Sequence, residues 1–309
     1  MTLALALQQQ VRTFAQRLPA DPRNYQIAAL SSLLVYGLTA LQFEIGGAQA
    51  AVTIAVAIAV QWIGTRLARQ PRFDPKSALI SALSLCLLLR CQSLTVAAAA
   101  AAIAIGSKYL VRWRGKHLFN PTNIALVVML ATGCAWVSPG QWGTPALFAF
   151  AIGCLGTLVV TRAARADITI AFLAAHALIL FGYSTWLGQP HAVPLHRLQS
   201  GTLLLFAFFM ISDPRTTPDS RRGRVLFAVL VATGAAFVQF ALLRTNGLLW
   251  SLAACSLLTP LIDRWLPHSR YTWPRGSAQP ATATGGESHE IAAPHIHVGL
   301  GAAVGATRR

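Results

Sequence analysis

Three short stretches of the sequence combine residue types that can bind an anion. Each places an Asp or Asn directly before a Pro: Asp74-Pro75, Asn120-Pro121 and Asp213-Pro214. The Asx side chain can cap a helix, and Pro fits the first helical turn because its missing N–H would have no partner there. The free N–H groups of such a turn, next to Lys and Arg side chains, favour an anionic group. A tight helix connection without a ligand is the alternative, and it stays open for all three.

His176 lies in the middle of a long apolar run, AFLAAHALIL. If this run crosses a membrane, an ionisable side chain there is costly unless it is hydrated or paired, which makes it a functional candidate. Because His titrates near neutral pH, a proton or ion relay is one interpretation. The other is a neutral His hydrogen-bonded to a neighbouring helix, and the sequence does not decide between them.

The composition predicts a membrane protein. Hydrophobic residues make up 55% of the chain and charged residues 11%, whereas about 25% is usual for charged residues in soluble domains. The net charge of +16 comes from Lys and Arg in short clusters between apolar runs. That pattern is typical of the positive-inside rule, so the predicted partner is the lipid bilayer and not nucleic acid. The five Cys residues form no CxxC pair, and no metal site is predicted.

Ten apolar runs predict an all-α polytopic membrane protein with about ten transmembrane helices. The runs span about residues 26–42, 48–65, 77–90, 93–107, 121–137, 145–161, 168–186, 199–212, 225–243 and 247–263. Several are short. Runs 77–90 and 199–212 are typical of the interrupted helices that carriers bury near the middle of the bilayer.

The basic residues predict the orientation. With ten spans and a cytoplasmic N-terminus, 22 Lys and Arg residues lie inside and three, Arg90, Arg197 and Arg244, lie outside. Both termini are then cytoplasmic, and the expected location is a bacterial plasma (inner) membrane. The predicted organisation is a cytoplasmic segment 1–24, a transmembrane domain 25–266 and a tail 267–309. This tail lacks periodicity, and we expect it to be disordered.

Three motifs resemble those of one protein family. They are GKHLFNP (115–121), FFMISDPRTTPDSRRGR (208–224) and TPLID (259–263). The family, NqrB/RnfD, comprises the D component of the Rnf electron-transport complex and the B component of the sodium-translocating NADH:quinone reductase. The resemblance runs in order from about residue 24 to residue 265 and identifies a divergent member. It implies two related five-helix halves in a complex with other proteins, and an electron-carrying or non-catalytic role in an ion-translocating oxidoreductase.

The resemblance also implies a flavin, FMN or riboflavin. Relatives attach FMN to a Thr in the pattern Asp-x-x-Ser-Gly-Ala-Thr. In this chain Thr144 aligns with the acceptor, but Ser138 replaces the Asp and Gln141-Trp142-Gly143 replaces Ser-Gly-Ala. The bulky indole argues against covalent attachment at Thr144. Thr202 is a weaker alternative acceptor.

A flavin bound without a covalent link would need polar donors for its phosphate or ribityl chain. The candidate donors are Lys116, His117, Asn120 and Asn123 at one junction, and Asp213, Arg215, Thr216 and Thr217 at the other. The candidate walls for its ring are Phe119, Phe206, Phe208 and Phe209. Packing within the helix bundle is the alternative role for these aromatic residues.

Two further functions stay open. A redox-silent relative could transport a small solute or ion, which the altered attachment motif and the short helices favour. A scaffold for a redox partner is the third possibility, and no residue of the sequence points to it.

Overall fold

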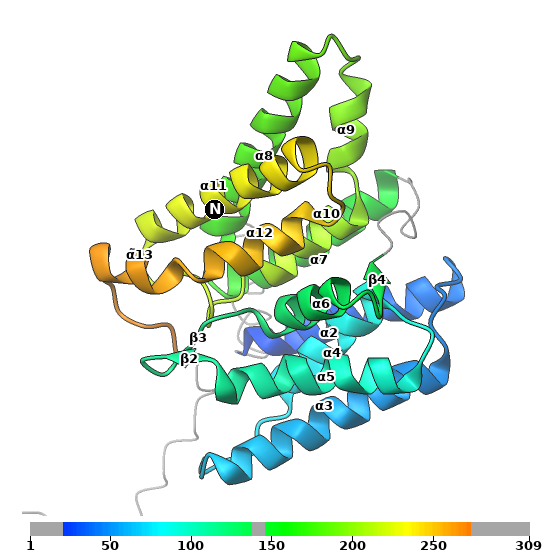
Figure 1. Ribbon diagram of the computed structural model, residues 1–309, viewed down its shortest axis with the longest axis vertical. Helices are drawn as coiled ribbons and strands as arrows, with labels where there is room; N and C mark the ends of the chain where they lie inside the picture. The colour runs from blue at the N-terminus through cyan, green and yellow to red at the C-terminus, as the bar shows by residue number, and fades with distance from the viewer. Residues whose placement is uncertain (1–20, 138–145, 273–309) are drawn as a thin grey trace, which may run out of the picture. The chain divides into compact units, whose positions relative to one another are not determined.

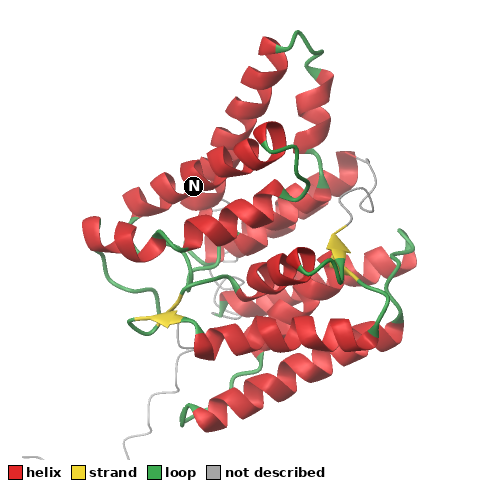
Figure 2. Ribbon diagram, viewed as in Figure 1, coloured by secondary structure: helices red, strands yellow, loops and turns green. Residues whose placement is uncertain are grey.

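The computed structural model describes residues 21–137 and 146–272, and these are mostly helical (Figure 2). Residues 21–137 hold the helices α2 (Pro22–Thr39), α3 (Gly47–Leu67), α4 (Lys76–Leu88), α5 (Leu94–Leu110) and α6 (Pro121–Ala131). Two pairs of very short antiparallel strands join them. Strand β1 (Leu89–Arg90) pairs with β4 (Trp136–Val137), and β2 (Arg112–Trp113) pairs with β3 (Lys116–His117).

The second stretch is also helical. It holds α7 (Ala146–Arg162), α8 (Ala166–Trp186), α9 (Ala192–Leu198), α10 (Gly201–Leu205), the π-helical turn η2 (Phe206–Met210), α11 (Arg221–Ala236), a second π-helical turn η3 (Phe237–Ala241), α12 (Gly247–Ser256) and α13 (Thr259–Trp265). Helix α9 falls in a stretch predicted to be loop. The sequence prediction missed it because seven residues are too few for a periodic pattern to show.

All ten predicted apolar runs contain a helix. Within the described ranges, three segments are long and apolar enough to cross a membrane: Gly47–Leu67, Ala166–Trp186 and Arg221–Ala241. The interrupted helices are confirmed as short and buried. Helix α4 has 13 residues and ends at a strand, and all five side chains of η2 are buried. The chain is therefore a helical protein, and three of its described segments have the length and apolar character of membrane spans.

The helices of residues 21–137 and those of residues 146–272 form two sets that pack in the same order. In the first set, α2 packs on α4, α3 on α5 and α5 on α6; in the second, α7 packs on α10 and η2, α8 on α11 and α11 on α12. In Figure 1 the first set forms the lower part of the drawing and the second set the upper part. Each interrupted helix thus has a counterpart in the other set.

The Asx-Pro stretches behave differently from one another. Asn120 is the predicted cap, since its Oδ1 accepts a hydrogen bond of 3.0 Å from the N–H of Asn123, with Pro121 in the first turn. Asp74 accepts from the N–H of Lys76 at 3.1 Å, at the start of α4. Asp213 does not begin a helix: its Oδ1 accepts from the N–H of Arg215 in a turn, and the next helix starts at Arg221.

A fourth stretch, Asp21-Pro22, was not singled out in the sequence. Asp21 caps α2 by accepting from the N–H of Arg23 at 3.0 Å. It also binds the side chains of Arg23 and Lys76, while Arg23 pairs with Asp74. Burial opposes ionisation of Asp21, but these hydrogen bonds outweigh it and lower its pKa to about 2. The starts of α2 and α4 are therefore held together by charge.

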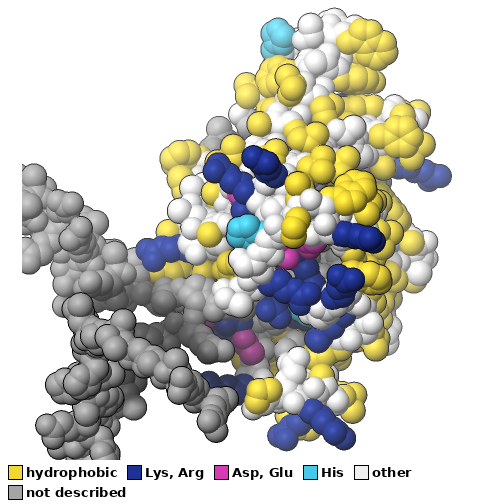
Figure 3. Space-filling model, turned by 90° about the vertical axis from the view of Figure 1, so that its left-hand side faces the viewer, with side chains coloured by type: hydrophobic (Ala, Val, Ile, Leu, Met, Phe, Trp, Pro, Cys, Tyr) yellow, Lys and Arg dark blue, Asp and Glu magenta, His cyan; other side chains and the backbone are white. Residues whose placement is uncertain are grey.

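Lys and Arg side chains gather on the face that carries α13 and the β2–β3 hairpin (Figure 3). We call this the basic end of the helices. The opposite end carries α9 and the β1–β4 pair.

Candidate functional site

A polar cavity of about 210 Å³ lies at the basic end. All four Asx-Pro stretches reach its lining, through Pro22, Asp74, Asn120-Pro121 and Asp213-Pro214. These residues are distant in sequence, and the packing of α2 on α4 and of α4 on α6 brings them together. The sequence predicted separate anion-binding turns. The structure shows that these turns surround one cavity.

Lys108 is the most deeply buried basic residue of the polar cavity. Its side chain projects from the last turn of α5 and is only 4% exposed. Its Nζ donates a hydrogen bond of 3.0 Å to the hydroxyl of Ser77 on α4. No pattern in the sequence indicated this, because a Lys near the end of an apolar helix normally extends to the aqueous interface.

Burial changes the acid–base behaviour of two groups in this cavity. It raises the pKa of the Asp213 carboxyl above its ordinary value, against the hydrogen bond from Arg215 and the charges of Arg215 and Lys108. Burial, together with the charges of Arg215, Arg112 and Lys108, lowers the pKa of His117 to about 3. His117 is therefore neutral at physiological pH.

Four of the predicted ligand-binding residues line the polar cavity: His117, Asn120, Asp213 and Arg215. The Asn120 amide donates to the carbonyl of Met210 at 3.2 Å, and lies 3.4 Å from the Asp213 carboxylate. This ties the start of α6 to the end of η2. The assignment of these residues to a flavin stays a prediction.

The other four predicted donors lie elsewhere. Lys116 forms ion pairs with Asp219 at 2.9 Å and Asp263 at 2.7 Å. The fully buried amide of Asn123 donates to the carbonyl of Leu249 at 3.1 Å. The hydroxyls of Thr216 and Thr217 both donate to the carbonyl of Asp213. Lys116 and Asn123 therefore join distant segments of the chain, whereas Thr216 and Thr217 stabilise the turn that follows Asp213.

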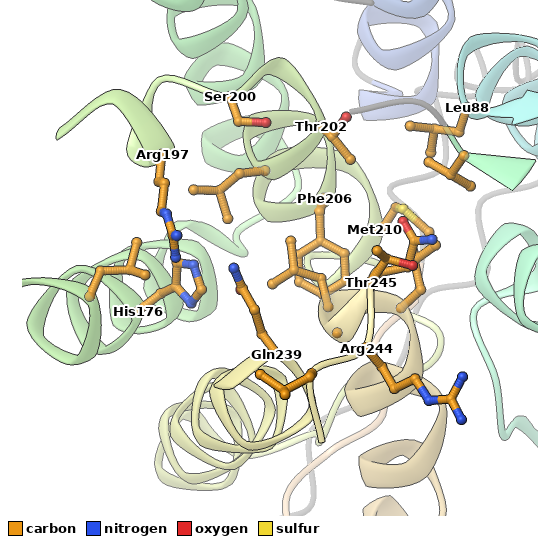
Figure 4. A pocket seen from close by; sticks show the side chains of 18 residues that line it. Leu88, His176, Arg197, Ser200, Thr202, Phe206, Met210, Gln239, Arg244 and Thr245 are labelled. Atoms are coloured by element: carbon orange, nitrogen blue, oxygen red, sulfur yellow. The ribbon is translucent and has the colours of Figure 1, made fainter. Parts of the chain in front are cut away.

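A larger cavity, of about 530 Å³, lies toward the opposite end and is shown in Figure 4. We call it the apolar cavity. Its walls come from α8, α10, η2 and α12, and include Leu180, Leu203, Phe206, Met210 and Leu249. Polar side chains enter from α8, α9, α10 and η3: His176, Arg197, Thr202 and Gln239.

His176 does reach a cavity. Its side chain is 5% exposed and stacks on Phe172, with ring centroids 5.5 Å apart. In Figure 4 the side chains of Arg197 and Gln239 both point toward the His176 ring. No hydrogen-bond partner for His176 Nδ1 or for the Thr202 hydroxyl lies in the described part of the chain. Unpaired buried polar atoms are costly, so this cavity suits a ligand with polar groups.

The loop with Thr144 lies outside the described residues. Val137, the last described residue before it, lines the apolar cavity. Of the predicted aromatic walls, Phe206 lines the apolar cavity and Phe209 the polar one.

Arg90 is a buried residue that the sequence placed at the outer end of run 77–90. It is 1% exposed, and its guanidinium donates to the carbonyls of Cys86, Leu87 and Leu89. These carbonyls lie at the C-terminal end of α4, where a helix has unpaired acceptors and favours a positive charge. Arg90 therefore caps the interrupted helix.

Comparison of the sequence with known proteins finds a family and several relatives that resemble part of this chain. The model of the NQR2, RnfD, RnfE family matches residues 132–272. A protein of Erwinia tasmaniensis, named as the D component of an ion-translocating oxidoreductase complex, is 30% identical over 150 residues, which is 48% of this chain and 37% of that protein. Proteins with the same name from Shewanella amazonensis and Tolumonas auensis are 35% identical over 97 residues and 36% identical over 74 residues.

These matches are partial, and each spans less than half the length of the relative. The segments of 97 and 74 residues cover 30% and 24% of this chain, and 26% and 21% of the Shewanella and Tolumonas relatives. The family match includes TPLID, the SDP turn, which borders the polar cavity, and η2, which borders both cavities. Residues 132–272 of this chain thus resemble the NQR2, RnfD, RnfE family, at modest identity to the relatives.

Proposed function

We propose that this protein is a membrane subunit of an electron-transport complex related to the ion-translocating oxidoreductases, working with other subunits in a bacterial inner membrane. The family match over residues 132–272 is the observation that carries the proposal. The name that the relatives share, which assigns them to an ion-translocating oxidoreductase complex, supports it.

We further propose ten spans in two halves of opposite orientation, with the basic end in the cytoplasm. Two features support this. The packing order of α2 to α6 recurs among α7, α8, α10, α11 and α12. Each cavity is lined by the start of an interrupted helix, α4 or α10, and by the start of the second helix after it, α6 or α12. Because each half has an odd number of spans, equivalent cavities fall at opposite ends of the bundle.

The flavin of this proposal is assigned to the apolar cavity. Its volume of about 530 Å³ lies within the range of roughly 300–1,000 Å³ typical of small-molecule sites. The walls are apolar, and His176 Nδ1 and the Thr202 hydroxyl lack partners in the described structure. A bound flavin would supply a group that accepts electrons one or two at a time.

The side chains of this cavity have separate roles in the proposal. Gln239 and Thr202 would hydrogen-bond the polar groups of a bound flavin, and His176 would orient it. The charge of Arg197 favours a ligand that gains negative charge. Leu180, Leu203 and Phe206 exclude water from the buried face.

The experiment that tests the proposal is flavin analysis of the full chain, purified in detergent from its native host. We expect flavin absorbance, release of the flavin on denaturation, and an unmodified mass for the Thr144 and Thr202 peptides. Arg197→Ala combined with Gln239→Ala should reduce the flavin content several-fold, about the effect of losing one or two hydrogen bonds of about 1 kcal/mol each. Arg72→Gln, an exposed change outside both cavities, is the matched control.

A colourless protein of unmodified mass would overturn the flavin assignment. A flavin mass on Thr144 would keep the electron-carrying role but overturn the non-covalent attachment. Equal flavin content in the double variant and the wild type would move the flavin away from the apolar cavity.

Passage of an ion or small solute is the second candidate function, and the polar cavity favours it. Lys108, which is buried, lines one cavity together with Asp74 and Asp213 at the start of the interrupted helix α4, an arrangement typical of ion-coupled carriers. Flux through liposomes that contain this chain alone, lost in Lys108→Met and retained in Arg72→Gln, would support this function.

A further inference from the structure

We propose that a third cavity, at the surface of the basic end, binds the phosphate group of an anionic ligand. The cavity has a volume of about 200 Å³ and lies between the β2–β3 turn, the start of α13 and the segment that follows α13. Its basic side chains include Arg114, Arg264 and Arg270, so we call it the Arg cavity. Neither electron transfer nor the flavin enters this proposal.

The charges in the Arg cavity are unbalanced. Its two carboxylates, Asp219 and Asp263, are both bound by Lys116. Within residues 21–137 and 146–272, no ion pair links an acidic side chain to Arg114, Arg264 or Arg270. A guanidinium presents parallel N–H donors that match two phosphate oxygens, so these three residues suit a phosphate better than a single-point anion.

Thr259 gives independent support. This residue lines the Arg cavity and is 2% exposed, yet its hydroxyl has no hydrogen-bond partner in the described structure. An unpaired buried hydroxyl costs free energy, which a ligand oxygen accepting its hydrogen bond would recover. Thr259 also begins the TPLID motif, whose Asp263 binds Lys116.

The β2–β3 turn brings the Arg residues together. Gly115 has a φ of +83°, a backbone conformation that glycine adopts readily. A Cβ at this position would lie 3.6 Å from the Nη1 atom of Arg270, so the guanidinium lies close over the turn. Arg114, in the same turn, also lines the cavity.

The position of the Arg cavity fits a phospholipid headgroup. Trp113 and Trp265, from the β2–β3 hairpin and the end of α13, are 55% and 68% exposed. Exposed Trp residues at the ends of apolar helices are typical of the membrane interface. Basic pockets at that level on the cytoplasmic side commonly bind anionic lipid headgroups. A soluble phosphate compound has the same chemistry and is the other source.

The test uses the delipidated full chain in neutral detergent, with phosphatidylglycerol, phosphatidylcholine and inorganic phosphate as probes. Native mass spectrometry should show phosphatidylglycerol adducts that outnumber phosphatidylcholine adducts. Arg264→Gln with Arg270→Gln should weaken phosphatidylglycerol binding by at least about tenfold, since hydrogen bonds to charged groups are worth about 1.5–3 kcal/mol. Thr259→Val should weaken it less, and Arg72→Gln should not change it.

The two sources give different results. Phosphatidylglycerol binding that excess inorganic phosphate does not displace indicates a lipid headgroup. Thermal stabilisation by inorganic phosphate in the wild type, absent from the double variant, indicates a soluble phosphate compound. Equal binding of the two lipids without any effect of phosphate would overturn the proposal, as would unchanged binding in the folded double variant. If the double variant does not fold, phosphatidylglycerol binding is compared between the wild type and Arg114→Gln, a single change in the β2–β3 turn.

Discussion

Side chains of the polar cavity have properties that their residue types alone do not give. Lys108 is buried next to Asp74 and Asp213, and His117 is kept neutral by burial and by the charges around it. In water, Lys would be charged and free and His would titrate near 6.5. The free energy of unfolding therefore depends on the protonation of these side chains, and unfolding experiments at different pH values can measure this.

We expect the stability of the protein to fall as the pH drops below about 6.5, in part because of His117. The unfolded chain takes up the His117 proton near its ordinary pKa of about 6.5, whereas the folded chain resists it down to about 3. His117 makes its full contribution to the free energy of unfolding above the unfolded pKa of about 6.5. This contribution is lost as the pH falls from about 6.5 to about 3. The loss is at most about 1.4 kcal/mol per pH unit.

Thermal unfolding in detergent at about pH 7, 6 and 5 measures this loss. His117→Asn should show a shallower decline than the wild type, while His196→Asn, on the exposed helix α9, should keep the wild-type slope. An equal slope in His117→Asn and the wild type would contradict the prediction.

Asp213 stabilises the turn that follows η2 through its side chain. Asp213→Ala removes the acceptor of the Arg215 N–H and should lower the free energy of unfolding by about 0.5–1.5 kcal/mol. Asp213→Asn keeps an oxygen in the same place and should cost less. Chemical unfolding of both variants decides the question, and an unchanged stability in the Ala variant would show that the turn does not depend on this side chain.

At the scale of elements, the close approach of α3 and α5 depends on Gly64. A Cβ on this residue would overlap the ring of Tyr109 on α5. The Tyr109 hydroxyl donates to the carbonyl of Gln61 at 3.2 Å and lies 3.2 Å from the Thr65 hydroxyl. Glycine therefore serves helix packing here, although it weakens the isolated helix.

Gly64→Ala should therefore destabilise the protein by about 1–3 kcal/mol, since overpacking must displace Tyr109 or separate the helices. Gly106→Ala is the matched control, because it lies in α5 with no atom within 4 Å of its added Cβ. That variant should be neutral or up to about 1 kcal/mol more stable. If both variants gain stability in thermal unfolding, the packing argument is wrong.

At the scale of the whole molecule, orientation is the property to test. The proposed topology puts the basic end in the cytoplasm, and the exposed thiol of Cys134 lies after α6, toward the opposite end. In a variant that keeps only this cysteine, a membrane-impermeant maleimide should label Cys134 in intact cells. A cysteine introduced by Arg72→Cys should react only after the membrane is opened. The reverse pattern would show that the orientation is inverted.

The membrane character, the apolar helices, the cap at Asn120 and the resemblance to the family could be predicted from the sequence, because hydropathy, capping and short motifs are local properties of the chain. Only the tertiary structure decided where the polar residues meet. Lys108 reaches Ser77 and Lys116 reaches Asp263 through the packing of helices that are far apart in sequence. No local pattern encodes those distances, and the partners that result make Lys116 structural and Lys108 part of the polar cavity.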